Sequence, residues 1–244
     1  MLAANIADVR LFYFLNGFDS TVIIISSSTP SPLPFPTCRA DDVDCLRRGL
    51  RTFFFLMDSR HFGMKPVDPS ILNSVAVNLP EDEMSFLMRR INVTGARWSK
   101  LLNREFNGQE GKSSVKFISD LHVTAEMRLT IPSRVQPYVG FITLDLQNVE
   151  TNITYNLHGL HGRNNEDYIL IGPERVVVRN MRAPSFFIQP NTEESIVMEQ
   201  VLNYKPAALE HLTNEITIAL MHSVVDNLRL FASKVPVKNY YTYF

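Results

Sequence analysis

The chain has 244 residues, a formal net charge of −1 and 20% charged residues. This length allows one domain of roughly 200 residues or two small ones, and the 45% hydrophobic content is ample for a large core. The near-neutral charge excludes an electrostatic grip on nucleic acid, which requires a basic face. Ten glycines in this length disfavour glycine-rich phosphate-binding architectures.

Residues 1–34 are interpreted as a degenerate signal peptide and a Pro/Ser-rich lead-in. The apolar stretches Leu11–Leu15 and Val22–Ile25 are separated by polar residues, whereas a secretory signal has one uninterrupted apolar stretch. The following Ser- and Pro-rich run is typical of a linker with room for a cleavage site, so we expect secretion. No later stretch approaches the roughly 18 apolar residues of a transmembrane helix, and no stable membrane insertion is expected.

The two cysteines, Cys38 and Cys45, are seven residues apart. A continuous helix would separate them by about 10 Å, which exceeds the Cα distance that a disulfide permits. A bond between them therefore requires a turn, with a helix that starts only near residues 41–44, where acidic side chains suit the first helical turn. Two unrelated buried thiols remain an alternative, whereas a zinc site lacks the required spacing.

An amphipathic helix follows the second cysteine and ends before Gly63. Its apolar residues recur at helical spacing: Val43, Leu46, Leu50, Phe53, Phe54 and Met57. Packing in a core is the plain interpretation of the phenylalanine run at 53–55.

The pattern changes to strands from about Ser74 to Gln189. Apolar and polar residues alternate from Val115 to Ile131, which predicts a long strand with its odd-numbered positions facing inward. A one-residue slip would bury Lys116 and Arg128 instead. Because such a strand would span roughly 55 Å, it must curl or contain a bulge.

Four further strands are predicted, at Phe141–Val149, Ile153–Leu157, Tyr168–Ile171 and Arg175–Met181. The turns between them are placed at Gly159, at 161–165 and at Gly172–Pro173. Short connections in series imply an antiparallel meander.

Two helices are predicted at the C-terminal end. Asn191 offers an N-cap with Glu194 three residues on, and a second helix from Pro206 to Phe231 would be roughly 39 Å long. Its apolar stripe comprises Leu209, Leu212, Ile216, Leu220, Val224, Leu228 and Phe231. So long a helix requires an equally long partner surface, which predicts an α+β fold with a curved antiparallel β-sheet wrapped around the C-terminal helix.

The sequence contains no recognisable catalytic or metal-binding motif. His158 and His161 are interpreted as exposed turn residues and His222 as a boundary histidine, since no third metal ligand stands at a recognisable spacing. The sequence also lacks a Gly-x-Ser-x-Gly elbow and a phosphate-binding loop. We therefore predict a protein without enzymatic activity, metal or cofactor, although a Ser/His/Asp triad is recognised only by its geometry.

Several segments, in this order, resemble the insect takeout and juvenile-hormone-binding protein family. The matching positions are Phe35, Pro36, Cys38, Cys45, Gly63, Asp68 and Pro69, then GFITLDLQNV at 140–149, QVLNYKPAALEHL at 200–212 and FASKVPVKNYY at 231–241. The family's tryptophan is absent near Tyr204. The resemblance covers 35–244 as one domain and implies a tubular lipid-binding fold with a disulfide between Cys38 and Cys45.

The resemblance further implies a secreted, extracellular carrier that holds a small hydrophobic molecule, such as a juvenile-hormone-like terpenoid or another lipid, in an elongated internal cavity. The chain contains only the first of the family's disulfide pairs, which favours a takeout-like, circadian clock-controlled-like member over a hormone-binding one. The ligand-binding residues expected on this basis are Leu50, Phe53, Phe54, Met57, Phe117, Leu121, Val123, Met127, Ile216 and Leu220.

Two alternatives are an extracellular signalling or interaction protein linked to circadian or feeding behaviour, with little ligand binding, and more distantly a lipid esterase. No particular protein partner is indicated. The aromatic residues at 240–244 are candidates to close one end of a cavity. Two sequons, at Asn92 and Asn152, permit N-glycosylation in a secretory setting.

Overall fold

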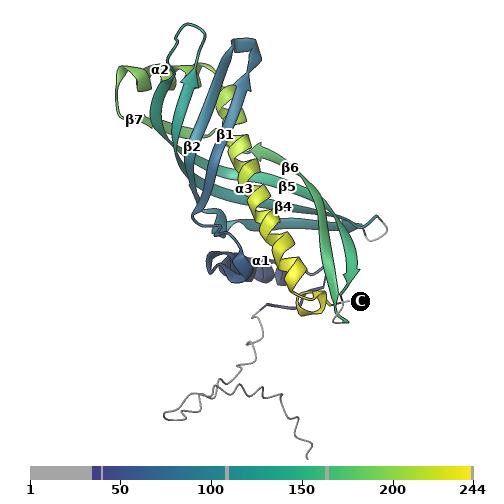
Figure 1. Ribbon diagram of the computed structural model, residues 1–244. Helices are drawn as coiled ribbons and strands as arrows, with labels where there is room; N and C mark the ends of the chain where they lie inside the picture. The colour runs from purple at the N-terminus through teal and green to yellow at the C-terminus, as the bar shows by residue number, and fades with distance from the viewer. Residues whose placement is uncertain (1–34, 40, 108–109, 163–164, 243–244) are drawn as a thin grey trace, which may run out of the picture. The chain divides into compact units, whose positions relative to one another are not determined.

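A computed structural model describes residues 35–39, 41–107, 110–162 and 165–242 (Figure 1). The predicted leader, 1–34, lies outside the described residues, and the predicted domain boundary at 35 stays a prediction. The strands are β1 (Ser70–Leu79), β2 (Met84–Thr94), β3 (Lys100–Asn107), β4 (Lys112–Thr130), β5 (Tyr138–His161), β6 (Asp167–Asn180) and β7 (Ser185–Gln189). The helices are α1 (Val43–Asp58), α2 (Glu193–Tyr204) and α3 (Pro206–Lys234), with short 3-10 turns η1 (His61–Gly63), η2 (Pro80–Asp82), η3 (Ala96–Trp98) and η4 (Val237–Asn239).

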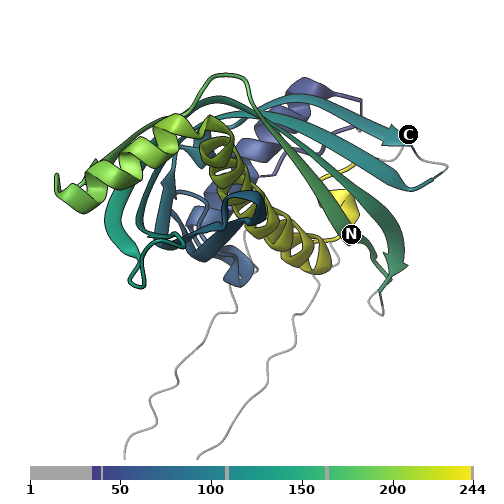
Figure 2. The ribbon, with the colours of Figure 1, turned by 90° about the horizontal axis from the view of Figure 1, so that it is seen from above.

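The described strands form one antiparallel sheet in the order β1-β2-β4-β5-β6, with β3 added to β4 and β7 to β5. Helix α3 contacts both outer strands of this order, β1 and β6, because the sheet curls around the helix (Figure 2). Its buried side chains lie on several sides of the helix, as expected for a helix enclosed by its surroundings. The predicted curved antiparallel sheet around a long C-terminal helix is confirmed.

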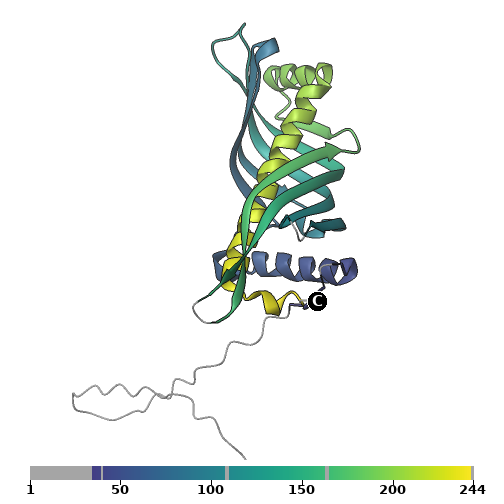
Figure 3. The ribbon, with the colours of Figure 1, turned by 90° about the vertical axis from the view of Figure 1, so that its right-hand side faces the viewer.

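Strands β4 and β5 run through two halves of this unit. The α2 half comprises β1, β2, β7 and α2, with residues 122–130 of β4 paired to β2. The α1 half comprises α1, β3 and β6, with residues 112–118 of β4 paired to β3. Figure 3 shows α1 lying across the end of the sheet, close to the C-terminal end of α3.

The long strand β4 bends as its length requires. Its pairing with β5 shifts between Ser119 and Leu121, where Asn148 of β5 has a positive φ of 54° and donates its backbone N–H to Asp120. Alternation along β4 is confirmed, because odd positions from Val115 to Leu129 are buried. Glu126 is a buried even position, and it forms ion pairs with Arg90 and Arg128.

Three predicted interruptions of the strands are wrong. Residues 150–152 continue β5 rather than interrupt it, since β4 and β6 satisfy their backbone groups on both sides. The predicted turn at Gly172–Pro173 lies within β6, and Gly159 lies within β5 opposite Ile169. An outermost strand tolerates proline because the missing N–H leaves no ladder partner unpaired.

Helix boundaries follow their capping residues. Asp42 accepts a hydrogen bond from the Cys45 backbone N–H (2.9 Å) and starts α1, as predicted. The N-cap of α2 is Thr192, in a reciprocal capping box with Ser195, so the predicted cap at Asn191 is one residue early. Helix α3 starts at Pro206 as predicted and extends to Lys234, three residues beyond the predicted end. In the described part of the chain, no helix is long and apolar enough to cross a membrane.

Candidate ligand-binding cavity

An apolar cavity of about 160 Å³ lies in the α1 half, between α1, the sheet and the C-terminal end of α3. For comparison, an engineered cavity of about 150 Å³ lined by aliphatic and aromatic residues binds benzene. The lining comprises Phe35, Cys38, Leu46, Gly49, Leu50, Phe53, Leu101, Arg104, Val115, Phe117, Ile153, Tyr155, Leu157, Ile169, Ile171, Val224, Val225, Leu228, Phe231, Ala232, Tyr240 and Tyr241.

The walls follow from strand and helix periodicity. Val115 pairs with Ile153 across β4 and β5, and cross-strand partners share a face of the sheet, so both point into the cavity. From α3, Val224, Leu228 and Phe231 recur at helical spacing and form the facing wall. The cavity is therefore lined by apolar faces, each of which the sequence pattern indicates for its own strand or helix.

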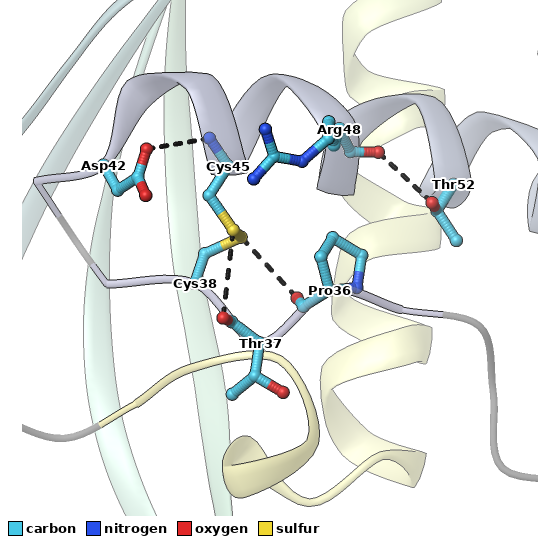
Figure 4. Close-up of a disulfide and its surroundings, with 7 residues drawn as sticks. All are labelled: Pro36, Thr37, Cys38, Asp42, Cys45, Arg48 and Thr52. Carbon is cyan, nitrogen blue, oxygen red and sulfur yellow. Dashed lines mark hydrogen bonds between the residues drawn. A yellow bond between two sulfur atoms is a disulfide. The ribbon is translucent and has the colours of Figure 1, made fainter.

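The two ends of the described chain close the cavity together. The Cys38 backbone N–H donates to Tyr240 O (3.0 Å), and the Thr242 N–H donates to Cys38 O (3.1 Å). Cys38 and Cys45 form a disulfide with a Cα–Cα distance of 5.5 Å, which confirms the predicted pair and ties this junction to the first turn of α1 (Figure 4). Ring contacts of Phe231 with Phe35 (5.2 Å between centroids) and Tyr240 (5.3 Å) complete the closure.

One end of the cavity is polar. Arg104 contributes the positive charge of the described lining, and its pairing opposite Val115 turns it inward. The guanidinium carbon lies 4.9 Å from the centre of the Tyr241 ring.

Burial raises the pKa of Tyr241 to about 12, although the positive charge of Arg104 works against this shift. Burial likewise raises the pKa of Tyr155, again opposed by Arg104. Both hydroxyls are therefore protonated at neutral pH, so this end offers a cation and hydrogen-bond donors.

The predicted ligand-binding residues divide between cavity and core. Leu50, Phe53 and Phe117 line the cavity. The other seven predicted residues are buried and are absent from its lining: Phe54, Met57, Leu121, Val123, Met127, Ile216 and Leu220. Contact of any of these ten residues with a ligand stays a prediction.

Sequence reasoning missed Arg104, Tyr155 and Leu101 as lining residues. The alternation of the predicted strand at 153–157 contained a signal for Tyr155, which is two residues from Ile153 and shares its face. Arg104 carried no such signal, because a charged residue in a short strand is usually assigned to the solvent face. Tyr240 and Tyr241, considered as candidates to close a cavity, do line it.

The histidines lie outside the cavity lining. His158 is exposed within β5, so its predicted place in a turn is wrong. His161 ends β5, and the hydrogen bond that its Nδ1 donates to the Asp167 carboxylate raises its pKa. His222 is an exposed residue of α3 that pairs with Glu174. Among the described residues, no group of three or more His, Cys, Asp or Glu could hold a metal ion, and the described cavity lining contains no Ser, His or Asp.

Both sequon asparagines lie within paired strands. Asn92 is in β2 with its side-chain oxygen buried, and Asn152 of β5 accepts a hydrogen bond from Ser114 (2.8 Å). Glycosylation at either position stays a prediction.

No protein-family model matches the chain, and a comparison with curated proteins gives no match. Among solved structures, the crystal structure of Epiphyas postvittana Takeout 1 is similar, with a TM-score of 0.73 and 16% identity, over 85% of this chain and 100% of that chain. The crystal structure of lipopolysaccharide binding protein gives a TM-score of 0.45 and 11% identity, over 80% of this chain and 39% of that chain, too low a score to support any statement. The chain has the fold of Takeout 1, and the takeout-type fold that the resemblance implied is confirmed.

Proposed function

We propose that this protein is a secreted, takeout-like carrier that binds a small hydrophobic ligand in the cavity of the α1 half. The observation that carries the proposal is the apolar cavity with a polar end formed by Arg104, Tyr155 and Tyr241. A few convergent polar groups in an apolar pocket are typical of sites that orient a ligand.

The energetic case needs no catalytic group. Burying about 400 Å² of apolar ligand surface contributes a gross gain of about 10 kcal/mol. Association costs of at least about 4 kcal/mol then leave at most about 6 kcal/mol, which corresponds to a Kd of roughly tens of micromolar. The cavity as described accepts a ring or a short branched chain, so a longer ligand must displace side chains.

The wall of the cavity beside β6 is where such displacement costs least. Leu157, Ile169 and Leu228 are half-buried there, so their movement exposes less apolar surface than movement of a core residue. The ligand that fits best has an apolar body in the cavity and an acidic or hydrogen-bond-accepting end against Arg104.

Displacement of a fluorescent fatty-acid probe by fatty acids and terpenoids tests the proposal. The wild-type protein should bind the probe at tens of micromolar, and Ala232→Leu should weaken binding because the larger side chain occupies part of the cavity. Ala207→Leu, the same change at an exposed position of the same helix, is the matched control. A folded wild-type protein that binds no apolar probe at tens of micromolar would contradict the carrier function and favour the interaction protein.

A further inference from the structure

A groove on the outside of the α1 half combines exposed aromatic and basic side chains. It has a volume of about 720 Å³ and runs between α1 and the segment formed by η3 and β3. Three of its apolar side chains are exposed: Trp98 (76%), Phe55 (62%) and Leu102 (40%). Single exposed apolar residues are common on protein surfaces, but several large ones gathered in one groove mark a contact surface.

The same groove is strongly basic. It is lined by four cations, Arg47, Arg51, Arg97 and Lys100, and by one carboxylate, Asp58. Arg97 forms an ion pair with Asp58, and Arg47 with the neighbouring Asp44. In the described part of the chain, no salt bridge engages Arg51 or Lys100. This surface is thus positive on a protein whose net charge is −1.

The groove also lies directly over the internal cavity. Leu50 of α1 and Leu101 of β3 line both spaces and form the partition between them. Arg47 braces this partition, because its Nε donates a hydrogen bond to Leu101 O (3.0 Å). An apolar molecule that enters from the groove would pass between these two leucines.

These features fit a lipid surface better than a protein surface. Tryptophan side chains concentrate at membrane–water interfaces, where the ring is buried and the N–H is solvated, and anionic headgroups attract clustered Lys and Arg. Protein interfaces are also enriched in Trp, Phe and Arg, but their cores are depleted in charged residues, whereas four cations line this groove beside its aromatic rings. We propose that the groove docks the protein on an anionic lipid surface, with Trp98 and Phe55 among the headgroups and Arg51 and Lys100 against the lipid phosphates. Docking would place the entrance to the cavity against the membrane.

Trp98 is the only tryptophan in the chain, so its emission reports directly on this surface. The purified protein, without added ligand, is mixed with phosphatidylcholine vesicles with and without phosphatidylserine. We expect co-sedimentation and a blue shift of Trp98 emission only with phosphatidylserine, and both should weaken as salt is raised because exposed charges are screened.

Charge reversal tests whether binding to the vesicles depends on this groove or only on the net charge of the protein. Arg51→Glu with Lys100→Glu should weaken vesicle binding by on the order of tenfold or more. Arg175→Glu with Arg179→Glu, the same charge change at exposed positions of β6, should leave binding unchanged. Both double variants should still bind the fluorescent fatty-acid probe in solution, so loss of docking is distinguished from loss of the cavity.

Three results would overturn the proposal. If folded wild-type protein sediments with neither kind of vesicle, the groove serves a protein partner. Equal losses in the two double variants would show that net charge, rather than this groove, drives binding. Sedimentation with no change in Trp98 emission would place the contact on another face.

Discussion

β4, β5 and α3 run through both halves of the unit, but they are packed differently in each. In the α2 half, Val123, Met127, Ile216 and Leu220 are completely buried and belong to the solid core. In the α1 half, equivalent inward positions such as Val115 and Leu228 line a cavity.

The helix that covers each end accounts for the difference. Met198 of α2 approaches β5 so closely that a Cβ at Gly140 would lie 3.0 Å from it, so helix and strand are in close packing contact there. Helix α1 instead meets α3 through rings, with Phe53 and Phe231 5.7 Å apart, and the space beside this contact is the cavity. An apolar strand face thus becomes core or cavity according to its covering helix.

Shortening leucine side chains of α3 should show the largest difference in stability between the two halves. Leu220→Ala should lower the free energy of unfolding by about 2–5 kcal/mol, because it opens a void in a packed core. Leu228→Ala, in the cavity wall, should cost about 1 kcal/mol. Denaturant unfolding measures both, and equal losses would contradict the distinction between core and cavity.

The disulfide belongs to the cavity end, where its removal should act. Changing both Cys38 and Cys45 to Ala should reduce the free energy of unfolding by about 2.5 kcal/mol, since the closed loop no longer restricts the unfolded chain. Probe affinity should fall as well, because Cys38 lines the cavity and holds the chain ends together. Unfolding of the wild-type protein with and without reductant provides the control.

Enlarging an inward residue of β4, instead of shortening one, should also affect the stability of the two halves differently. Ala125→Trp adds volume where the core has no free space, so it should lower the free energy of unfolding by about 1–3 kcal/mol or more. Val115→Leu, in the cavity wall, should cost less and should weaken probe binding. If Ala125→Trp blocked the probe without loss of stability, an open tunnel would extend into the α2 half.

Arg104 should determine which ligand end group binds at the polar end of the cavity. Arg104→Met should weaken binding of a fatty acid by on the order of tenfold, because a charge-assisted hydrogen bond is lost. The methyl ester of the same fatty acid should bind the wild-type protein and the Arg104→Met variant with equal affinity. Arg48→Met, at an exposed position of α1, is the control, and an equal effect on acid and ester would contradict a carboxylate at this end.

The smallest effect should come from charges between β6 and α3 in the α1 half. Burial raises the pKa of Glu174, but hydrogen bonds with His222 and Arg229 outweigh it and leave the pKa below its usual value of 4.5. The ionised carboxylate therefore stabilises the fold above that value, and this contribution is lost as pH falls through the lower, folded value. The difference in unfolding free energy between wild type and Glu174→Gln should shrink on acidification, whereas exposed Glu199→Gln should show a small difference at every pH.

Much of the fold could be predicted because its elements repeat regularly. The α1 helix, the inward face of β4 and the start of α3 all follow from periodicity and capping residues. The breaks predicted at 150–152 and at Gly172–Pro173 were wrong because polar residues and proline were taken as turns. Residues 150–152 pair with β4 on one side and β6 on the other, and Gly172–Pro173 fall at an irregularity in the pairing of β5 with β6. Local patterns identify neither arrangement.

The sequence by itself determined which face of each element is apolar, and its seven-residue cysteine spacing allowed a disulfide once the chain turned. Only the tertiary structure decided which apolar residues meet a partner and which border a void. Periodicity specifies the direction of a side chain but not the distance to the opposite wall, so Phe117 and Val123 look alike in sequence. The inward position of Arg104 was decided in the same way, because its register with Val115 and the ring of Tyr241 exist only after the chain ends meet.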